Sequence, residues 1–328
     1  MSATWIAKPL FSLQPRECSL FQGIIGPLHP LSQTLEWASA LQTSADVPFL
    51  VFCPERKISA VFLVSGTDAE CVNGPVLNWE RIHTARELNE QVSLVVYALH
   101  QSNPTLRNIR IRPRLLEEQY RFLNSNLAFP VDRVDEARTM ILDLRENVQD
   151  QWFALPSRIR SEILRAERSG VQVSQKPFHE ELNRFWSQTR DFYQKRNLFA
   201  PEETWLRALL LGHADSVLQP VLLEAIHPES GSQAEVLLLL FGKIGLYFFA
   251  HETRSESCPN VSLNACAQWE AIQICIRSGV RHYDLNGISA SGADSGHRDS
   301  FQGVDFYKRR FKGREVSYFS PVICFGAG

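Results

Sequence analysis

Two short stretches decide the fold: Tyr283-Asp284-Leu285-Asn286-Gly287, and Gly303-Val304-Asp305-Phe306-Tyr307-Lys308-Arg309-Arg310-Phe311-Lys312-Gly313. The first is predicted to be a strand that starts at Arg281, after a helix from Pro259 to Ser278 that ends at Gly279. The intervening residues 289–300 are polar and rich in Gly and Ser, which is typical of a loop. A helix, a strand, a polar loop and an aromatic, basic segment therefore follow one another at close spacing.

A second anchor lies earlier in the chain. Leu142-Asp143-Leu144 belongs to a predicted strand that starts at Thr139, and a helix from Arg158 to Ser169 follows it. Pro156 stands at an early position of this helix and Gly170 just past its end, as helix boundaries prefer. The two anchors are separated by further alternating strands and helices, which indicates an α/β or α+β fold.

The two anchors together resemble the Fem family of peptidoglycan-bridge aminoacyltransferases (FemABX) and related acetyltransferase-like proteins. The family signature combines a Trp-containing helix, a Tyr-Asp-hydrophobic strand and Gly…aromatic-Lys-x-x-Phe-Gly. It also has a helix of the type Arg-x-x-Ile-Arg-x-Ala-x-Arg-x-Gly-Val, which Arg158 to Val171 matches. The resemblance covers the second half of the chain well and the first half in outline.

The resemblance implies two tandem acetyltransferase-like (GNAT-like) domains with mixed central sheets. We expect an N-terminal domain at residues 1–140 and a C-terminal domain at 141–313, with residues 314–328 packing back onto the first domain. No heptad pattern is sustained between Lys176 and Pro259, so the chain is predicted to lack the helical arm of some cell-wall members.

The remaining sequence completes this outline. Helices are also predicted at residues 84–100 and 180–195, and strands at residues 48–53, 58–64, 108–113, 221–226, 235–241 and 246–250.

The composition is that of a globular protein. The 328 residues are 44% hydrophobic and 21% charged with a net charge of −2, so no global basic field indicates nucleic acid. The N-terminal residues lack a signal peptide and no apolar run is long enough for a transmembrane helix, so we expect a cytoplasmic protein without stable membrane insertion. The seven scattered cysteines include no CxxC pair, which argues against a zinc ribbon. The oligomeric state is left open.

Several cofactor motifs are absent from the sequence. It contains no P-loop, GxGxxG, HExxH or GxSxG motif. The turn 257–261, where ordinary acetyltransferases have glycines that hold the pyrophosphate of acyl-CoA, has no glycine and contains Pro259. We therefore expect no cofactor, with aminoacyl-tRNA as co-substrate and acyl-CoA as the alternative.

The resemblance implies transfer of an amino acid from its tRNA ester to an amine, with formation of an amide bond. The acceptor is expected to be a muropeptide of a peptidoglycan precursor or an amine-bearing, peptide-like metabolite. Aminolysis of an activated ester runs downhill, so the enzyme needs chiefly to hold both substrates and stabilise the oxyanion. The alternatives are a CoA-dependent N-acyltransferase and a non-catalytic scaffold for cell-envelope or polysaccharide assembly.

Three residues are predicted to be catalytic. Lys308 matches the family lysine that is implicated in stabilising the oxyanion; the alternative is a solvated lysine in a basic run. Tyr307 replaces the usual Phe and lines the site, or is a core aromatic. Asp284 orients or deprotonates the attacking amine, or is a structural hydrogen-bond acceptor.

Substrate binding is predicted for Arg196, Arg165, Tyr193, Tyr247 and Asn286. Arg196 matches a family arginine that is associated with phosphate, and Arg165 lies in a helix whose four arginines could contact phosphate. Exposed arginines are the alternative, because Glu162 and Glu167 are interleaved with those on the helix. Asn286 and Lys312 each stand where the family usually has Gly, and a basic residue expected in the first domain has no match in Pro30–Trp37.

Overall fold

The computed structural model describes residues 3–24, 30–43, 45–196, 200–211, 216–288 and 302–326. Contacts divide the chain into two compact units. The first comprises Met1–Ala137, Thr204–Ser216 and Ser317–Gly328, and the second Arg138–Glu203 and Val217–Val316. From the sequence we expect the domain boundaries after residue 140 and after residue 313. These boundaries also assign residues 204–216 to the second domain, whereas their contacts group them with the first unit.

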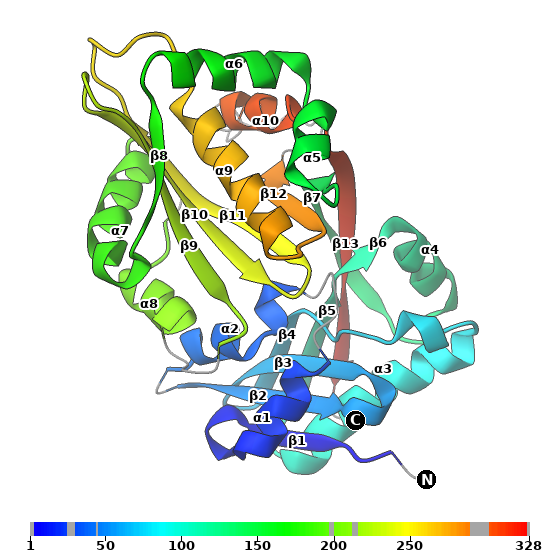
Figure 1. Cartoon of the computed structure of the whole chain (residues 1–328). Helices are drawn as coiled ribbons and strands as arrows, with labels where there is room; N and C mark the ends of the chain where they lie inside the picture. The colour runs from blue at the N-terminus through cyan, green and yellow to red at the C-terminus, as the bar shows by residue number, and fades with distance from the viewer. Residues whose placement is uncertain are drawn as a thin grey trace. The chain divides into compact units, whose positions relative to one another are not determined.

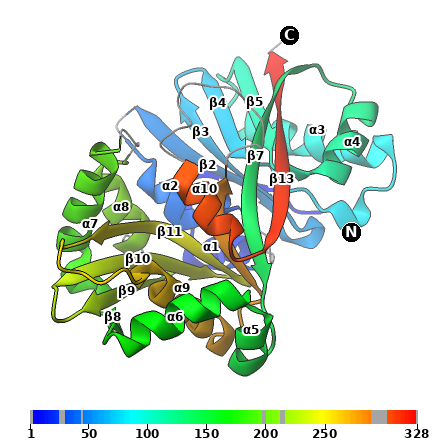
Figure 2. The same cartoon turned by 90° about the horizontal axis from the view of Figure 1, so that it is seen from above.

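The first unit contains a mixed sheet with the strand order β1-β2-β3-β4-β5-β13 (Figure 1). The pair β4 and β5 is parallel and the other pairs are antiparallel, and Figure 2 shows β4, β5 and β13 side by side. The final strand enters this unit at Ser317 and also pairs with the short strand β6. The strands are β1 (Ile6–Pro9), β2 (Asp46–Cys53), β3 (Ile58–Ser65), β4 (Asp68–Asn73), β5 (Asn108–Pro113), β6 (Leu115–Leu116) and β13 (Arg314–Gly326).

Helices cover both faces of this sheet. Helix α3 begins after Thr84, whose side chain accepts a hydrogen bond from the Glu87 N–H in a capping box, and Leu88 and Val92 belong to one hydrophobic core. Phe21 and Leu35 belong to the core on the other face. The helices are α1 (Pro15–Gln22), α2 (Leu35–Ala40), α3 (Ala85–Ser102), α4 (Glu117–Asn126) and α8 (Glu203–Leu211), with 3-10 turns at Leu10–Ser12, Leu31–Gln33, Pro54–Arg56 and Trp79–Arg81.

The second unit contains another mixed sheet, with the order β7-β12-β11-β10-β9-β8. The pair β11 and β12 is parallel and the others are antiparallel. The strands are β7 (Val131–Asp143, which enters this unit at Arg138), β8 (Gln172–Lys176), β9 (Gln219–His227), β10 (Ser232–Phe241), β11 (Ile244–Thr253) and β12 (His282–Ile288). The mixed α/β architecture predicted from the sequence is confirmed.

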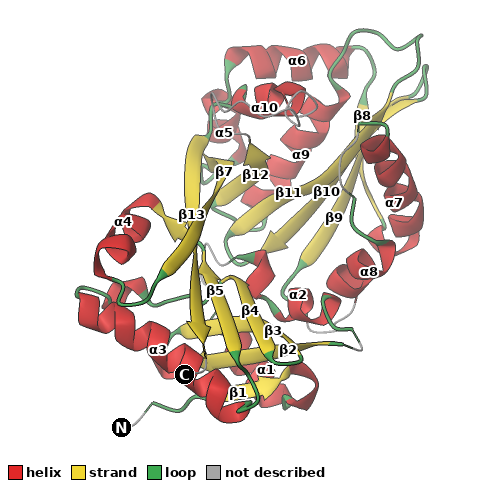
Figure 3. Ribbon diagram, turned by 180° about the vertical axis from the view of Figure 1, so that it is seen from behind, coloured by secondary structure: helices red, strands yellow, loops and turns green. Residues whose placement is uncertain are grey.

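Helices α9 and α7 pack on opposite faces of the second sheet (Figure 3). On β10, Val236 and Leu238 face α9, whereas Glu235 faces α7. The predicted start of α9 at Pro259 is wrong: the helix begins at Leu263, because the Ser262 side chain accepts the Ala265 N–H and caps it. The helices are α5 (Val148–Ala154), α6 (Ser157–Arg168), α7 (Phe178–Gln194), α9 (Leu263–Arg277) and α10 (Gln302–Arg309).

Among the described residues, no helix combines the length and the apolar character that crossing a membrane requires. Between Lys176 and Pro259 the described helices are α7, with 17 residues, and α8, with 9.

Candidate functional site

A cavity of about 630 Å³ lies in the second unit, where β11 and β12 stop pairing. Their last paired residues are Leu246 and Asp284. Beyond this point Tyr247 on β11 and Asn286 on β12 line the cavity. The lining residues are Phe192, Tyr193, Arg196, Tyr247, Phe248, Phe249, Ala250, His251, Glu252, Asn264, Asn286, Gly287, Gly303, Val304, Tyr307 and Lys308.

A bulge in β11 shapes one wall of the cavity. Leu237 pairs with Phe249 and Leu238 pairs with Tyr247, so Phe248 is an extra residue in this strand. A bulge re-aims the side chains around it, and such bulges are frequent beside active sites. Here three consecutive aromatic residues, Tyr247, Phe248 and Phe249, all line the cavity.

Lys308 lies in the last turn of α10 with only 6% of its surface exposed. Its ammonium donates a hydrogen bond of 2.7 Å to the backbone oxygen of Gly287 and lies 5.9 Å from the ring centre of Tyr247. Burial lowers the pKa of Lys308 to about 8, although the negative charges of Asp305 and Asp284 oppose the shift. The cavity therefore contains a cation that titrates close to neutral pH.

Asp284 and Asn286 organise the bulge in β12 that presents the Gly287 carbonyl. The Asp284 Oδ1 atom accepts hydrogen bonds from the Thr139 hydroxyl and from the Asn286 N–H, the latter at 2.7 Å. Asn286 has a φ of +66°, and its Oδ1 atom accepts the Gly287 N–H at 2.8 Å. Asn tolerates this left-handed conformation better than most residues, which explains how it can stand where the family usually has Gly. Asp284 itself does not line the cavity.

A cluster of tyrosines surrounds the same space. Burial raises the pKa of Tyr193 to about 12 and also raises the pKa values of Tyr247, Tyr283 and Tyr307. Tyr283 donates to Gln268, Tyr247 is hydrogen-bonded to the side chain of Asn264, and Tyr193 to the backbone of Ala250. The buried Tyr307 hydroxyl has no hydrogen-bond partner among the described residues.

The C-terminal end of α7 contributes another wall. The Arg196 guanidinium lies 3.6 Å from the ring centre of Phe192, and Tyr193 and Arg196 both line the cavity. Arg165 lies elsewhere: it is exposed on α6 and is not among the lining residues. The structure thus brings together Lys308, Tyr307, Arg196, Tyr193, Tyr247 and Asn286, and their roles stay predictions.

A buried polar network behind the cavity was not predicted from the sequence. Glu235 has no exposed surface; it binds Arg184 through both carboxylate oxygens, at 2.7 and 2.9 Å, and lies 3.1 Å from His251 Nε2. The Thr189 hydroxyl lies 3.0 Å from His251 Nδ1. These contacts lower the pKa of Glu235 although burial raises it. The network ties α7 to β10 and β11. The sequence feature that could have indicated this network is Glu235, a charged residue in a predicted strand that is otherwise apolar.

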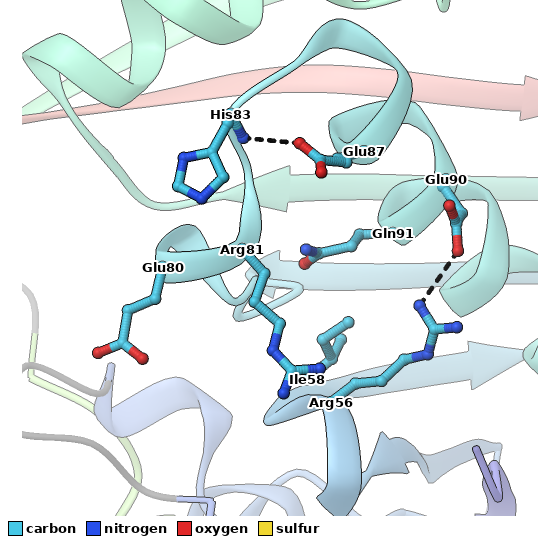
Figure 4. Close-up of a pocket in the computed structure, with 8 residues that line it drawn as sticks. All are labelled: Arg56, Ile58, Glu80, Arg81, His83, Glu87, Glu90 and Gln91. Atoms are coloured by element: carbon cyan, nitrogen blue, oxygen red, sulfur yellow. Dashed lines mark hydrogen bonds and ion pairs between the residues drawn. The ribbon is translucent and has the colours of Figure 1, made fainter. Parts of the chain in front are cut away.

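A smaller cavity of about 340 Å³ lies in the first unit (Figure 4). Two of its acidic side chains have structural partners: Glu90 pairs with Arg56 at 3.1 Å, and Glu87 accepts the His83 backbone N–H at 2.9 Å at the start of α3. Helix capping and ion pairing account for these groups. Across the described residues, no group of three or more His, Cys, Asp or Glu side chains could hold a metal ion.

Comparison with solved structures shows the fold. Over 96% of both chains, this chain is similar to FemX, with a TM-score of 0.71 and 14% sequence identity. It is also similar to L-PGS from Bacillus licheniformis, over 96% of this chain and 93% of that chain, with a TM-score of 0.57 and 13% identity. No protein-family model matches the sequence, and a search of curated proteins found no match.

Proposed function

We propose that this chain, which has a Fem-type fold of tandem GNAT-like domains, is an amide-forming acyltransferase. The observation that carries the proposal is the buried Lys308 ammonium, which lines a cavity large enough for an acyl group and an amine. The acyl donor is proposed to be aminoacyl-tRNA. The acceptor is proposed to be an amine on a peptidoglycan precursor or on a peptide-like metabolite.

The proposed reaction is the aminolysis of an ester. The acceptor nitrogen forms a bond to the carbonyl carbon, the ester C–O bond breaks, and the ribose hydroxyl leaves with a proton from the amine. Negative charge builds on the carbonyl oxygen during the attack. Lys308 donates one N–H to Gly287 and keeps others for this oxygen. In a buried site such a donor stabilises the charge more strongly than it does in water.

Asp284 fits a supporting role in this scheme. Its Oδ1 atom holds the Thr139 hydroxyl and the Asn286 N–H, and its charge favours the protonated form of Lys308. We propose that it fixes the bulge in β12 whose Gly287 carbonyl accepts from the ammonium. Tyr193, Tyr247 and Arg196 line the space for the donor, and Arg196 is the cation suited to a phosphate of the RNA.

The start of α9 supports an RNA-linked donor over acyl-CoA. A pyrophosphate binds a helix N-terminus through free backbone N–H groups. Here the Ser262 hydroxyl already accepts the Ala265 N–H, and the preceding turn contains Pro259 and no glycine. Fewer donors are therefore left for the phosphates of CoA.

The test is a transfer assay with purified protein, a pool of labelled aminoacyl-tRNA and candidate amines that include muropeptides, read by mass spectrometry. We expect an amide product that disappears when the donor pool is treated with RNase before the protein is added. If product forms only with acyl-CoA, the acyl donor is acyl-CoA and the proposal of an aminoacyl-tRNA donor is wrong. If no donor yields product and Lys308→Ala leaves the cellular phenotype of the gene intact, the catalytic proposal is wrong.

A further inference from the structure

We infer that Asn264 and Tyr307 recognise the free amino group of the donor's acyl moiety. The chain therefore discriminates α-aminoacyl esters from acyl esters whose nitrogen is blocked. This inference rests on the proposed function and adds to it two specificity-determining residues.

The first observation is the unpartnered hydroxyl of Tyr307. The side-chain oxygen is buried, and no described residue forms a hydrogen bond with it. A buried hydroxyl without a partner costs about 1–3 kcal/mol, so a ligand that supplies one gains affinity there. The other three tyrosines of the cluster already have partners within the protein. Tyr307 is thus the tyrosine of this cluster that is left to contact a ligand.

The second observation is the Asn264 side chain at the start of α9. Its Oδ1 atom is buried and has no hydrogen-bond partner among the described residues. The same side chain is hydrogen-bonded to Tyr247 and lowers the pKa of that phenol against the larger effect of burial. Because the Oδ1 atom has no partner, the amide nitrogen makes the bond to Tyr247, and the oxygen is free to accept.

The two unpartnered groups belong to residues that line one cavity together with Tyr247. Asn264 binds the Tyr247 hydroxyl, and the proximity of Tyr247 contributes to the raised pKa of Tyr307. Asn264 and Tyr307 both line the cavity that Lys308 lines. The free atoms are an amide oxygen, which only accepts, and a phenol oxygen, which can accept. Both suit the N–H groups of an amine.

The position of these groups suits an α-amino group. Tyr307 and Lys308, both on α10, line the same cavity. In an aminoacyl ester the amino nitrogen is two bonds from the carbonyl carbon, so a carbonyl that Lys308 polarises places the amine close by. An N-acetylated donor has one N–H left, carries an extra acetyl group and no longer satisfies both acceptors. A site built around buried polar groups rejects such an analogue because the groups stay unpaired.

The chain offers a conservative test. Tyr307→Phe removes only the hydroxyl and restores the residue that the Fem family usually has. Asn264→Leu removes the acceptor and keeps the branched shape of the side chain, and Asn264→Asp keeps the acceptor. Tyr97→Phe, at an exposed tyrosine of the first unit, is the matched control for the loss of a hydroxyl.

The experiment compares single-turnover transfer from an aminoacyl-tRNA pool with transfer from the same pool after N-acetylation by acetic anhydride. We expect wild type to prefer the free amine by at least about 10-fold. Tyr307→Phe and Asn264→Leu should each reduce that preference by about 3- to 10-fold, which is the loss of one hydrogen bond. Asn264→Asp and Tyr97→Phe should keep it.

Equal transfer from both pools by wild type would overturn the inference and leave the proposed function standing. The inference is also wrong if the two variants slow both donors equally, because that pattern indicates a structural role. Transfer from neither pool overturns the proposed function and the inference with it. Thermal melting of each variant shows whether it folds. If Asn264→Leu does not fold, the comparison of Tyr307→Phe with Asn264→Asp still tests the inference.

Discussion

Lys308 Nζ donates to the backbone oxygen of Gly287 at 2.7 Å, at a bulge in β12 where the Asn286 side chain accepts the Gly287 N–H. This backbone carbonyl thus orients the ammonium and leaves its other N–H groups for a ligand. No carboxylate forms a hydrogen bond with this ammonium among the described contacts, so its charge is compensated only through space, by Asp305 and Asp284. Such a cation is costly to bury, and it is effective when negative charge develops beside it.

Lys308→Met tests the catalytic role, since Met is of similar length and uncharged. We expect single-turnover transfer to fall by about 100- to 1,000-fold, the usual loss for one oxyanion donor. The melting temperature at pH 7 should not fall, because the substitution removes a buried charge. Lys243→Met, at an exposed lysine, is the control. If Lys308→Met stays active, another hydrogen-bond donor stabilises the oxyanion and the role proposed for Lys308 is wrong.

The pH dependence of transfer follows from the lowered pKa of Lys308. The rate should decline above about pH 8 as the ammonium loses its proton, and rise on the acid side as the acceptor amine becomes neutral. Lys308→Arg should move the alkaline limb beyond the measured range, because Arg stays protonated. Rates from pH 6 to 9, corrected for hydrolysis of the ester without protein, provide the check. An unchanged alkaline limb in Lys308→Arg contradicts the assignment.

Lys308 also predicts how stability changes with pH. Its pKa is lower in the folded protein than the ordinary value of 10.5, so the unfolded chain binds more protons between pH 8 and 10.5. The free energy of unfolding should therefore gain a favourable contribution as pH rises through this window. Urea unfolding of wild type and Lys308→Met at pH 7.5 and 9.5 isolates the effect. A stability difference between the two proteins that does not change with pH would show that the lysine is not buried as a cation.

Glu235→Gln should destabilise the second unit. The change removes the carboxylate that Arg184 and His251 share, although Arg184 keeps its ion pair with Glu181 at 2.6 Å, and we expect a loss of about 2–3 kcal/mol. This figure lies below that of a fully buried pair because Arg184 is 36% exposed. The pKa of Glu235 is lowered, so its stabilisation is present above the ordinary pKa of 4.5 and is lost as pH falls below it. Urea unfolding at pH 7 and pH 4 should show a smaller gap between the two proteins at pH 4.

The turn after α10 offers a matched pair of opposite substitutions. Lys312 has a φ of +53°, so Lys312→Gly should stabilise the protein by about 0.5–1 kcal/mol. At the next residue a Cβ would lie 2.7 Å from the Ile141 carbonyl oxygen, so Gly313→Ala should destabilise. Thermal melting of both variants provides the measurement. A stable Gly313→Ala variant would mean that the backbone there can shift without cost.

The strands and helices of the second unit were largely predictable from the sequence because their periodicity is strong. The strand Ser232–Phe241 and the helix Phe178–Gln194 differ from their predicted ranges only at the ends. The motif from Tyr283 to Gly313 contains both Lys308 and Asn286, which line one cavity, whereas no motif contained Tyr247. Asn264 was missed because the predicted helix began too early and placed it mid-helix. The Glu235 and His251 pair was missed because their contact depends on the register of two strands, which side-chain patterns do not specify.

The C-terminal strand has a consequence for how the protein is made. Ile323 to Gly326 pair with β5, at residues 108–111, so the sheet of the first unit includes residues that are synthesised after all of the second unit. Domains usually fold in the order in which they leave the ribosome. Here the second unit has all of its residues before the first has its last strand. Until then the edge of β5 lacks its partner, and the nascent first unit is the part that we expect chaperones to protect.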